Sequence, residues 1–232
     1  NVKTEDERLE HMAIGVTEIQ AGSMRVRGRS LGGFYTGLHV PEFSALFDVG
    51  TALRSGASAK NLFLSHAHAD HLGSLPSLIG MRGLIGIDRP IRLFCPAEIA
   101  DFIQPALNAF SSMHRWPMSV ELIPMAPGDE YQLSKGLFVR AFRTLHTVPS
   151  LGYLLFRRVQ KMRPEFIGLE GQEIQRRRRA GEDLFRTIER LELAYATDTL
   201  PEVLDRNPEL LTVSNLILEC TFLDERKSIK AA

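Results

Sequence analysis

Short apolar runs that end in turn residues recur along the chain, and each run predicts a strand. These runs lie at residues 14–19, 24–26, 45–47, 62–64, 91–94, 120–123, 137–142, 153–156, 193–196 and 216–222. Helical spacing of apolar residues predicts a helix within residues 73–86 and another over residues 97–110, which Pro105 should kink or divide. Gly28, Gly32 and Gly33 indicate turns. Because strands and helices alternate through both halves of the chain, we expect an α/β fold.

The apolar run at residues 62–64 is followed at once by an unusual group of polar side chains: His66, His68, Asp70 and His71. Because His66 and His68 are two residues apart at the end of a strand, their side chains leave on the same side. A turn after the strand can fold Asp70 and His71 back beside them. Imidazole and carboxylate groups are ligands of zinc and similar divalent metals. The spacing therefore predicts a metal site rather than ordinary surface histidines.

Other predicted strands also end in residues that bind metals or brace loops. Asp48, His146 and Asp198 each stand at such an end. Ligands of α/β proteins gather where strand ends meet loops, so we expect these residues to share one site with the histidine segment. Asp48 can brace a neighbouring loop by accepting backbone N–H bonds. His39 has no partner near it in sequence and is predicted to be structural.

The chemistry of these side chains predicts two metal ions. One ion would take the nitrogens of His66, His68 and His146, and a second would take Asp70 and His71, with Asp198 bridging both. Two metals about 3.5–4 Å apart lower the pKa of a shared water and stabilise the attacking and leaving oxygens of a displacement. This arrangement suits hydrolysis of a phosphodiester, and it also serves other esters or amides.

Composition limits the partners and the compartment. The 28 basic and 28 acidic residues give zero formal net charge, so a nucleic-acid role requires a local basic patch. Residues 176–179 are four arginines, which form either a solvated helix face or a phosphate-contacting patch. No apolar run reaches the ~18 residues of a membrane helix, and Cys95 and Cys220 form no CxxC pair. We expect a soluble, cytoplasmic protein without a membrane partner.

One domain is predicted over residues 13–232. Residues 1–12 are charged, lack periodicity and are predicted to be a flexible or vector-derived leader. Hydrophobic residues make up 44% of the chain and charged residues 24%, which is ordinary for a globular domain with a core.

Several blocks of the chain resemble the metallo-β-lactamase superfamily and, within it, the short form of tRNase Z. The histidine segment 66–71 together with His146 and Asp198 resembles the metal motif of the superfamily. The blocks that resemble the tRNase Z branch are residues 40–43 with 47–50, 81–84, 165–174, 196–199 and 219–224. The resemblance runs from about residue 14 to the end of the sequence.

The resemblance implies a four-layer αββα sandwich with metals along one edge. It implies a zinc-dependent endoribonuclease, with two zinc ions per site in a complete chain, that removes the 3′ trailer of precursor tRNA. Asp70 would ligate metal and position or deprotonate the attacking water, and Glu219 would orient a catalytic histidine further along. The family works as a homodimer, and residues 73–84 are either its contact or an ordinary buried helix.

The chain departs from this pattern in two places. No histidine follows His146, whereas the family has two more, one of which ligates the second metal. We therefore expect the C-terminal part of the domain to be missing here, and the second metal to bind weakly if these residues are the whole molecule. Between Tyr153 and Leu193 we predict a compact arginine-rich insertion in place of the protruding arm, rich in glycine and proline, of many relatives.

Two other functions stay open. The same metals also suit a hydrolase of a small ester or phosphodiester, which would cleave small substrates but not a bulky precursor tRNA. The absence of later histidines also suits an inactive remnant that serves as a binding or dimerisation module. The complete set of His66, His68 and His146 beside Asp70 argues against the remnant.

Overall fold

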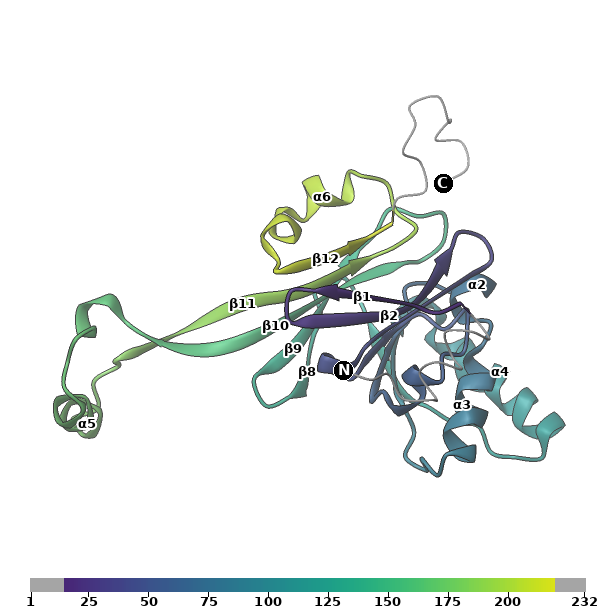
Figure 1. Ribbon diagram of the computed structural model, residues 1–232, viewed down its shortest axis with the longest axis horizontal. Coiled ribbons are helices and arrows are strands. Elements are labelled where there is room, and N and C mark those ends of the chain that lie inside the picture. Colours follow the sequence, from purple (N-terminus) through teal and green to yellow (C-terminus); the bar gives the residue numbers. More distant parts are fainter. Residues whose placement is uncertain (1–14, 220–232) are drawn as a thin grey trace.

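The computed structural model describes residues 15–219, and its strands form two sheets that pack face to face (Figure 1). The strand order is β1-β2-β3-β4-β5-β6-β7 in the first sheet and β12-β11-β10-β9-β8 in the second. The strands of the first sheet are β1 (Thr17–Ala21), β2 (Met24–Leu31), β3 (Tyr35–Val40), β4 (Ala45–Phe47), β5 (Asn61–Phe63), β6 (Arg92–Pro96) and β7 (Glu121–Met125). Those of the second are β8 (Glu130–Ser134), β9 (Leu137–Arg143), β10 (Leu151–Met162), β11 (Phe185–Ala196) and β12 (Asn215–Leu218). The predicted leader at residues 1–12 and Cys220 lie outside the described residues.

Helices cover the outer faces of both sheets, which confirms the predicted four-layer order. The first sheet is covered by α2 (Ala69–Leu72), α3 (Leu75–Leu84) and α4 (Ala97–His114). The second is covered by the short α6 (Val203–Arg206) and the 3-10 helix η4 (Pro208–Thr212). Three connections contain the 3-10 helices η1 (Pro41–Phe43), η2 (Ser55–Ser58) and η3 (Pro164–Phe166). No helix in the described part of the chain has the length and apolar character needed to cross a membrane.

The described residues form three hydrophobic cores, and alternating side chains of β4 and β5 contribute to two of them. Leu46 and Leu62 belong to the core under the helices, where Leu78 of α3 also lies. Phe47 and Phe63 belong to the core between the sheets, and their ring centroids are 5.3 Å apart. Because β4 and β5 are packed on both faces, the loops that follow them start from fixed positions.

The turn predicted at Gly28 and the division of the second helix predicted at Pro105 are wrong. Gly28 does not form a turn but lies inside β2, where a Cβ atom would come within 2.1 Å of the Gly37 carbonyl oxygen of β3. Glycine is needed there because the neighbouring strand approaches closely. Pro105 does not divide α4, which continues from Ala97 to His114. Pro105 is exposed, so water can solvate the carbonyl group that loses its helical partner.

The predicted compact insertion is also wrong, because β10 and β11 extend beyond the sheet as a long two-stranded arm (Figure 1). Strand pairing runs from Tyr153 opposite Tyr195 out to Met162 opposite Phe185. The tip carries α5 (Gly171–Arg179), which has no buried residue. The arm therefore gains little stability from a core, and its shape must come from contacts between its own strands.

A closed ring of ion pairs stabilises the base of this arm. Arg140 of β9 contacts Glu130 at 2.6 Å and Glu189 at 2.8 Å, and Arg158 of β10 contacts the same two carboxylates at 2.5 and 3.0 Å. Arg158 also lies over the Phe156 ring, 5.2 Å from its centroid. Networks of this kind contribute more than isolated surface pairs because each charge has two partners. Ion pairs thus stabilise the base of the arm, as apolar contacts stabilise the cores.

The surroundings of His39 agree with the structural role predicted for it. It lies in β3 opposite Arg27 and Leu46, is 4% exposed, and its Nδ1 has no hydrogen-bond partner among the described residues. Burial, followed by the positive charge of Arg27, lowers the pKa of His39 from 6.5 to about 4. Protonation of His39 is therefore less favourable in the folded state than in the unfolded chain.

We expect this histidine to make the fold sensitive to acid. Between pH 6.5 and about 4 the unfolded state binds more protons, so stability falls as the pH falls through this window. The loss is on the order of 3 kcal/mol, at about 1.4 kcal/mol per pH unit. Urea unfolding at a series of pH values should show a flatter profile for His39→Leu than for the unchanged protein. Equal slopes for the two proteins would contradict this account.

Candidate metal centre

The predicted site residues lie together at one edge of the two sheets, where the central strands end. Strands β4 and β5 are parallel neighbours, and the loops after them carry Asp48 and the histidine segment 66–71. His146 lies in the loop between β9 and β10, and Asp198 follows β11 with a φ of 45°. Residues from both sheets thus converge, as the strand ends predict.

The loop after β4 holds α2 against the first sheet. The Val49 N–H donates to the carbonyl of His71 at 2.6 Å, and the Gly50 N–H donates to the carbonyl of Thr36 at 2.8 Å. A Cβ atom on Gly50 would lie 1.6 Å from the carbonyl oxygen of Asp70. Only glycine permits this approach, and the approach places Asp70 and His71 beside the strand ends.

The first cluster contains three imidazoles and a carboxylate: His66, His68, His146 and Asp198. The Nδ1 of His68 lies 3.0 Å from the Nε2 of His66 and 3.2 Å from the Nε2 of His146. An oxygen of Asp198 lies 3.6 Å from the Nε2 of His66. Nitrogen ligands of zinc at 2.0–2.1 Å stand about 3.3 Å apart in a tetrahedron, so these spacings fit one ion.

The second cluster shares Asp198 with the first and adds Asp70 and His71. The Nε2 of His71 lies 3.5 Å from the Asp70 carboxylate and 3.4 Å from the Asp198 carboxylate. These spacings also suit a single divalent ion. Both predicted ligand sets are therefore brought together, with Asp198 between them.

The protonation of the clusters also fits a cation. Burial, and then the charge of His71, lowers the pKa of His66 to about 4, and burial lowers the pKa of His146. Both rings are therefore neutral near pH 7 and present lone pairs to the same space. The Nε2 of each ring lies within 3.2 Å of the Nδ1 of His68. Three nitrogens placed in this way suit one divalent metal.

His71 and Asp198 form a strongly coupled pair in the absence of metal. Burial lowers the pKa of His71, but hydrogen bonds to Asp198 and Asp48 outweigh it and raise that pKa to about 10. Burial raises the pKa of Asp198, but the hydrogen bond and charge of His71 lower it to about 2. A proton on His71 thus stands where the second metal would bind, and the two compete for the same nitrogen.

Asp48 belongs to neither cluster but braces the histidine loop, in agreement with its expected role. Its Oδ1 accepts the Ser65 N–H at 2.7 Å, and its Oδ2 accepts the Tyr195 hydroxyl at 2.6 Å. Sequence reasoning missed Ser65 and Tyr195. A tyrosine in a buried apolar strand does signal a hidden hydrogen-bond partner, but the sequence does not say which one.

Glu219 follows β12 and contacts the loop that carries Asp198. Its carboxylate accepts the Thr199 N–H at 3.2 Å, and the Thr199 hydroxyl in turn accepts the Leu145 N–H at 2.9 Å, next to His146. Thr199 therefore connects the two loops that the second sheet contributes, and Glu219 holds the backbone of Thr199. Thr199 is a further residue that sequence reasoning missed.

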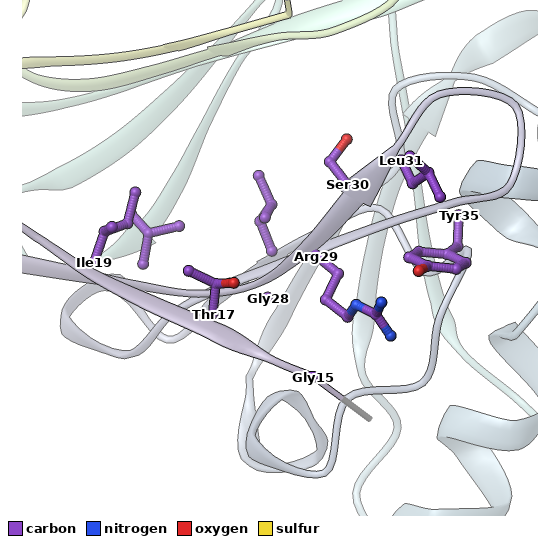
Figure 2. Close-up of a pocket in the computed structure, with 10 residues that line it drawn as sticks. Gly15, Thr17, Ile19, Gly28, Arg29, Ser30, Leu31 and Tyr35 are labelled. Carbon is purple, nitrogen blue, oxygen red and sulfur yellow. The ribbon is translucent and has the colours of Figure 1, made fainter. Parts of the chain in front are cut away.

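A separate pocket of about 380 Å³ lies beside β1, β2 and β3 (Figure 2). Thr17, Ile19 and Leu38 are among its lining residues, and the Arg29 guanidinium lies 4.7 Å from the centroid of the Tyr35 ring. Its lining contains no histidine and no carboxylate. It is therefore distinct in chemistry from the two clusters.

Known proteins resemble this chain over most of its length. A family model described as the beta-lactamase superfamily domain matches residues 38–230. The chloroplastic tRNase Z TRZ2 of Arabidopsis thaliana is 35% identical over 98% of this chain and 65% of its own length. The nuclear ribonuclease Z of Triticum aestivum is 36% identical over 70% of this chain and 92% of its own length. The tRNase Z TRZ1 of A. thaliana is 31% identical over 89% of this chain and 74% of its own length.

The chain thus spans 65% of the chloroplastic relative and larger shares of the other two. The family match and these identities agree with the two-sheet fold and with the clustered histidines and carboxylates at its edge. This chain belongs to the metallo-β-lactamase superfamily and, within it, to the tRNase Z (ribonuclease Z) family.

Proposed function

We propose that this chain is a metal-dependent endoribonuclease that removes the 3′ trailer of precursor tRNA. The observation that carries the proposal is the pair of ligand clusters sharing Asp198, in a chain about one-third identical to proteins named tRNase Z. We propose zinc as the metal because three imidazoles and a carboxylate form a typical zinc ligand set. The second cluster would hold a second zinc.

The residues of the two clusters then have separate tasks. A bound metal pair supplies Lewis-acid chemistry, which activates water and stabilises charge on the attacking and leaving oxygens. We assign Asp70 to orient the attacking water and accept its proton, because its side chain is 15% exposed and faces His71. Glu219 is a positioning residue that acts through Thr199 on the loop of Asp198.

The arm favours a large substrate over a small ester. Strand β10 begins at Leu151, shortly after His146, and β11 ends at Ala196, directly before Thr197 and Asp198. Twelve residues of β10 span about 40 Å, so a substrate that contacts both the arm and the metal edge is macromolecular. A small ester would need only the edge.

Replacement of Asp70 by alanine tests the hydrolytic assignment. We expect Asp70→Ala to lower the rate of cleavage of a precursor tRNA more than about 100-fold, since loss of a ligand should exceed the effect of losing a supporting residue. Asp88→Ala, which changes an exposed carboxylate in the segment before β6, is the matched control and should cleave normally. Thermal unfolding should be similar for both variants. Retained turnover in Asp70→Ala would remove the two-metal mechanism.

The arm tip has two arginines suited to contact RNA phosphates. Glu173 pairs with Arg176 and Arg177, each at 2.7 Å, whereas Arg178 and Arg179 have no ion pair among the described residues. Arg178 and Arg179 are both exposed. This uncompensated charge favours the phosphate-contacting interpretation of the arginine run over a merely solvated face.

Removal of these charges should weaken RNA binding without affecting the chemistry. For Arg178→Ala with Arg179→Ala we expect weaker precursor tRNA binding and a slope of log affinity against log salt that is smaller by about 0.7–0.9 per lost contact. Hydrolysis of bis(p-nitrophenyl) phosphate should not change. The Arg178→Lys, Arg179→Lys protein keeps the charge and is the control. An unchanged salt slope in the alanine variant would refute a role for the tip.

We further propose a homodimer whose contact is the outer face of α4. Phe102 and Met113 are 72% and 69% exposed, and they lie about three turns apart on this face. The helix begins with exposed Glu98 and Asp101 and ends beside Arg115. Two copies packed antiparallel about a two-fold axis would place acidic ends against basic ends. Residues 73–84 are divided between the two interpretations, since Leu78 of α3 is fully buried whereas Leu84 is 90% exposed.

Sedimentation of the purified protein tests this contact. We expect a dimer that Phe102→Glu with Met113→Glu converts to a monomer, because two charges per subunit would be buried without partners. Phe34→Glu is the control, since Phe34 is equally exposed, at 72%, but lies between β2 and β3. A monomeric parent protein, or a dimer in the double variant, would exclude α4 as the contact.

The cellular compartment is proposed on cysteine chemistry alone. Cys95 is a buried free thiol, and free thiols are typical of reducing compartments. We propose a cytoplasmic location on this ground. One relative is named chloroplastic, so compartments differ within the family.

A further inference from the structure

A chain of buried hydrogen bonds connects one imidazole of each cluster. Asp48, Ser65, His66 and His71 are all at most 1% exposed. The Oδ2 of Asp48 lies 2.8 Å from the Nδ1 of His71. The Ser65 hydroxyl lies 2.9 and 2.8 Å from the two oxygens of Asp48 and 3.0 Å from the Nδ1 of His66.

The protons in this chain can be assigned from donor and acceptor capacity. The Asp48 carboxylate already accepts the Ser65 N–H and the Tyr195 hydroxyl, and a carboxylate can only accept. The Nδ1 of His71 must therefore carry a proton and donate it to Asp48. This leaves the Nε2 of His71 facing Asp70 and Asp198 in the second cluster.

The same reasoning fixes His66. A serine hydroxyl has one proton, and the shortest contacts of the Ser65 hydroxyl are to Asp48. Its oxygen is then an acceptor toward its other neighbours, so the Nδ1 of His66 must donate to it. The longer contact of 3.4 Å from the Ser65 hydroxyl to the Nδ1 of His71 agrees, since that nitrogen is also a donor. The Nε2 of His66 is left without a proton, facing His68.

We infer that Ser65 is a positioning residue. It passes the influence of the buried Asp48 carboxylate to His66, so that this one carboxylate fixes which ring nitrogen carries the proton in a histidine of each metal cluster. The inference rests on the proposed metal centre. Without the Ser65 hydroxyl, the Nδ1 of His66 has no acceptor, and the proton can move to Nε2, where it blocks the metal. Groups that fix a ligating histidine in this way typically change metal affinity about 10- to 100-fold.

Tyr195 supports the same carboxylate from the second sheet. Its ring packs against Phe47, with centroids 4.8 Å apart, while its hydroxyl meets Asp48. Burial raises the pKa of Tyr195 well above its usual value, so the hydroxyl keeps its proton and remains a donor. Ser65 and Tyr195 thus hold Asp48 between the two sheets. The orientation of the His66 and His71 rings depends on that placement.

Two measurements on Ser65→Ala test this inference. Long-range proton–nitrogen NMR of the metal-free protein reports the tautomer of His66, and chelator competition reports zinc affinity at neutral pH. We expect the unchanged protein to have its proton on Nδ1, and Ser65→Ala to mix tautomers and bind zinc about 10- to 100-fold more weakly. Ser150→Ala is the matched control, because the buried Ser150 hydroxyl contacts Thr144, at 2.5 Å, and no cluster histidine.

The possible results separate the inference from the proposed function. An unchanged tautomer and affinity in Ser65→Ala, or equal losses in Ser65→Ala and Ser150→Ala, would overturn the inference. A proton on the Nε2 of His66 in the unchanged protein would overturn it even where Ser65→Ala does not fold. Failure of the unchanged protein to bind zinc would instead reject the proposed metal centre, while the tautomer of His66 would still decide the role of Ser65.

Discussion

A buried carboxylate is the interaction on which the edge of this molecule depends. Asp48 is fully buried, and an isolated carboxylate in such a place would cost several kcal/mol. It is satisfied by donors from both sheets: Ser65 and His71 from the first and Tyr195 from the second. A shift of the two sheets relative to each other at this edge would therefore break the hydrogen bond from Tyr195 to the buried carboxylate. The loops that carry the candidate ligands follow a junction of the two sheets that this bond stabilises.

This junction also explains how three imidazoles are held close together. The Nδ1 of His68 lies 3.0 Å from a nitrogen of His66 and 3.2 Å from a nitrogen of His146. The packed strands β4 and β5 and the hydrogen bonds of Asp48 hold the segment that carries His66 in place. The proposed ion would therefore meet ligands that are already in position, which lowers the entropic cost of binding.

Much of the site could be predicted from the sequence because its residues stand at strand ends. His66, His146 and Asp198 each follow an apolar run, and the ends of parallel and neighbouring strands meet at one edge. The supporting residues could not be predicted in the same way. Tyr195 contacts Asp48 across 147 positions of sequence, and nothing local in either strand specifies that pairing. The arm was missed because its strands are held by charges such as those of Arg158 and Glu189, which an apolar pattern does not reveal.

The tip of the arm and the candidate metal site lie at opposite ends of the same two strands, β10 and β11. His146 lies just before β10 and Asp198 just after β11, while the far ends of both strands meet α5. The paired strands, with the ion-pair ring of Arg140 and Arg158 at their base, keep their two ends at a fixed separation. The proposed binding of RNA does not need a net positive charge, because residues 176–179 place four arginines at the tip. The position of the proposed cleavage would then be set by the distance between the arm tip and the ligand clusters. It would not be set by attraction between RNA and the net charge of the whole protein.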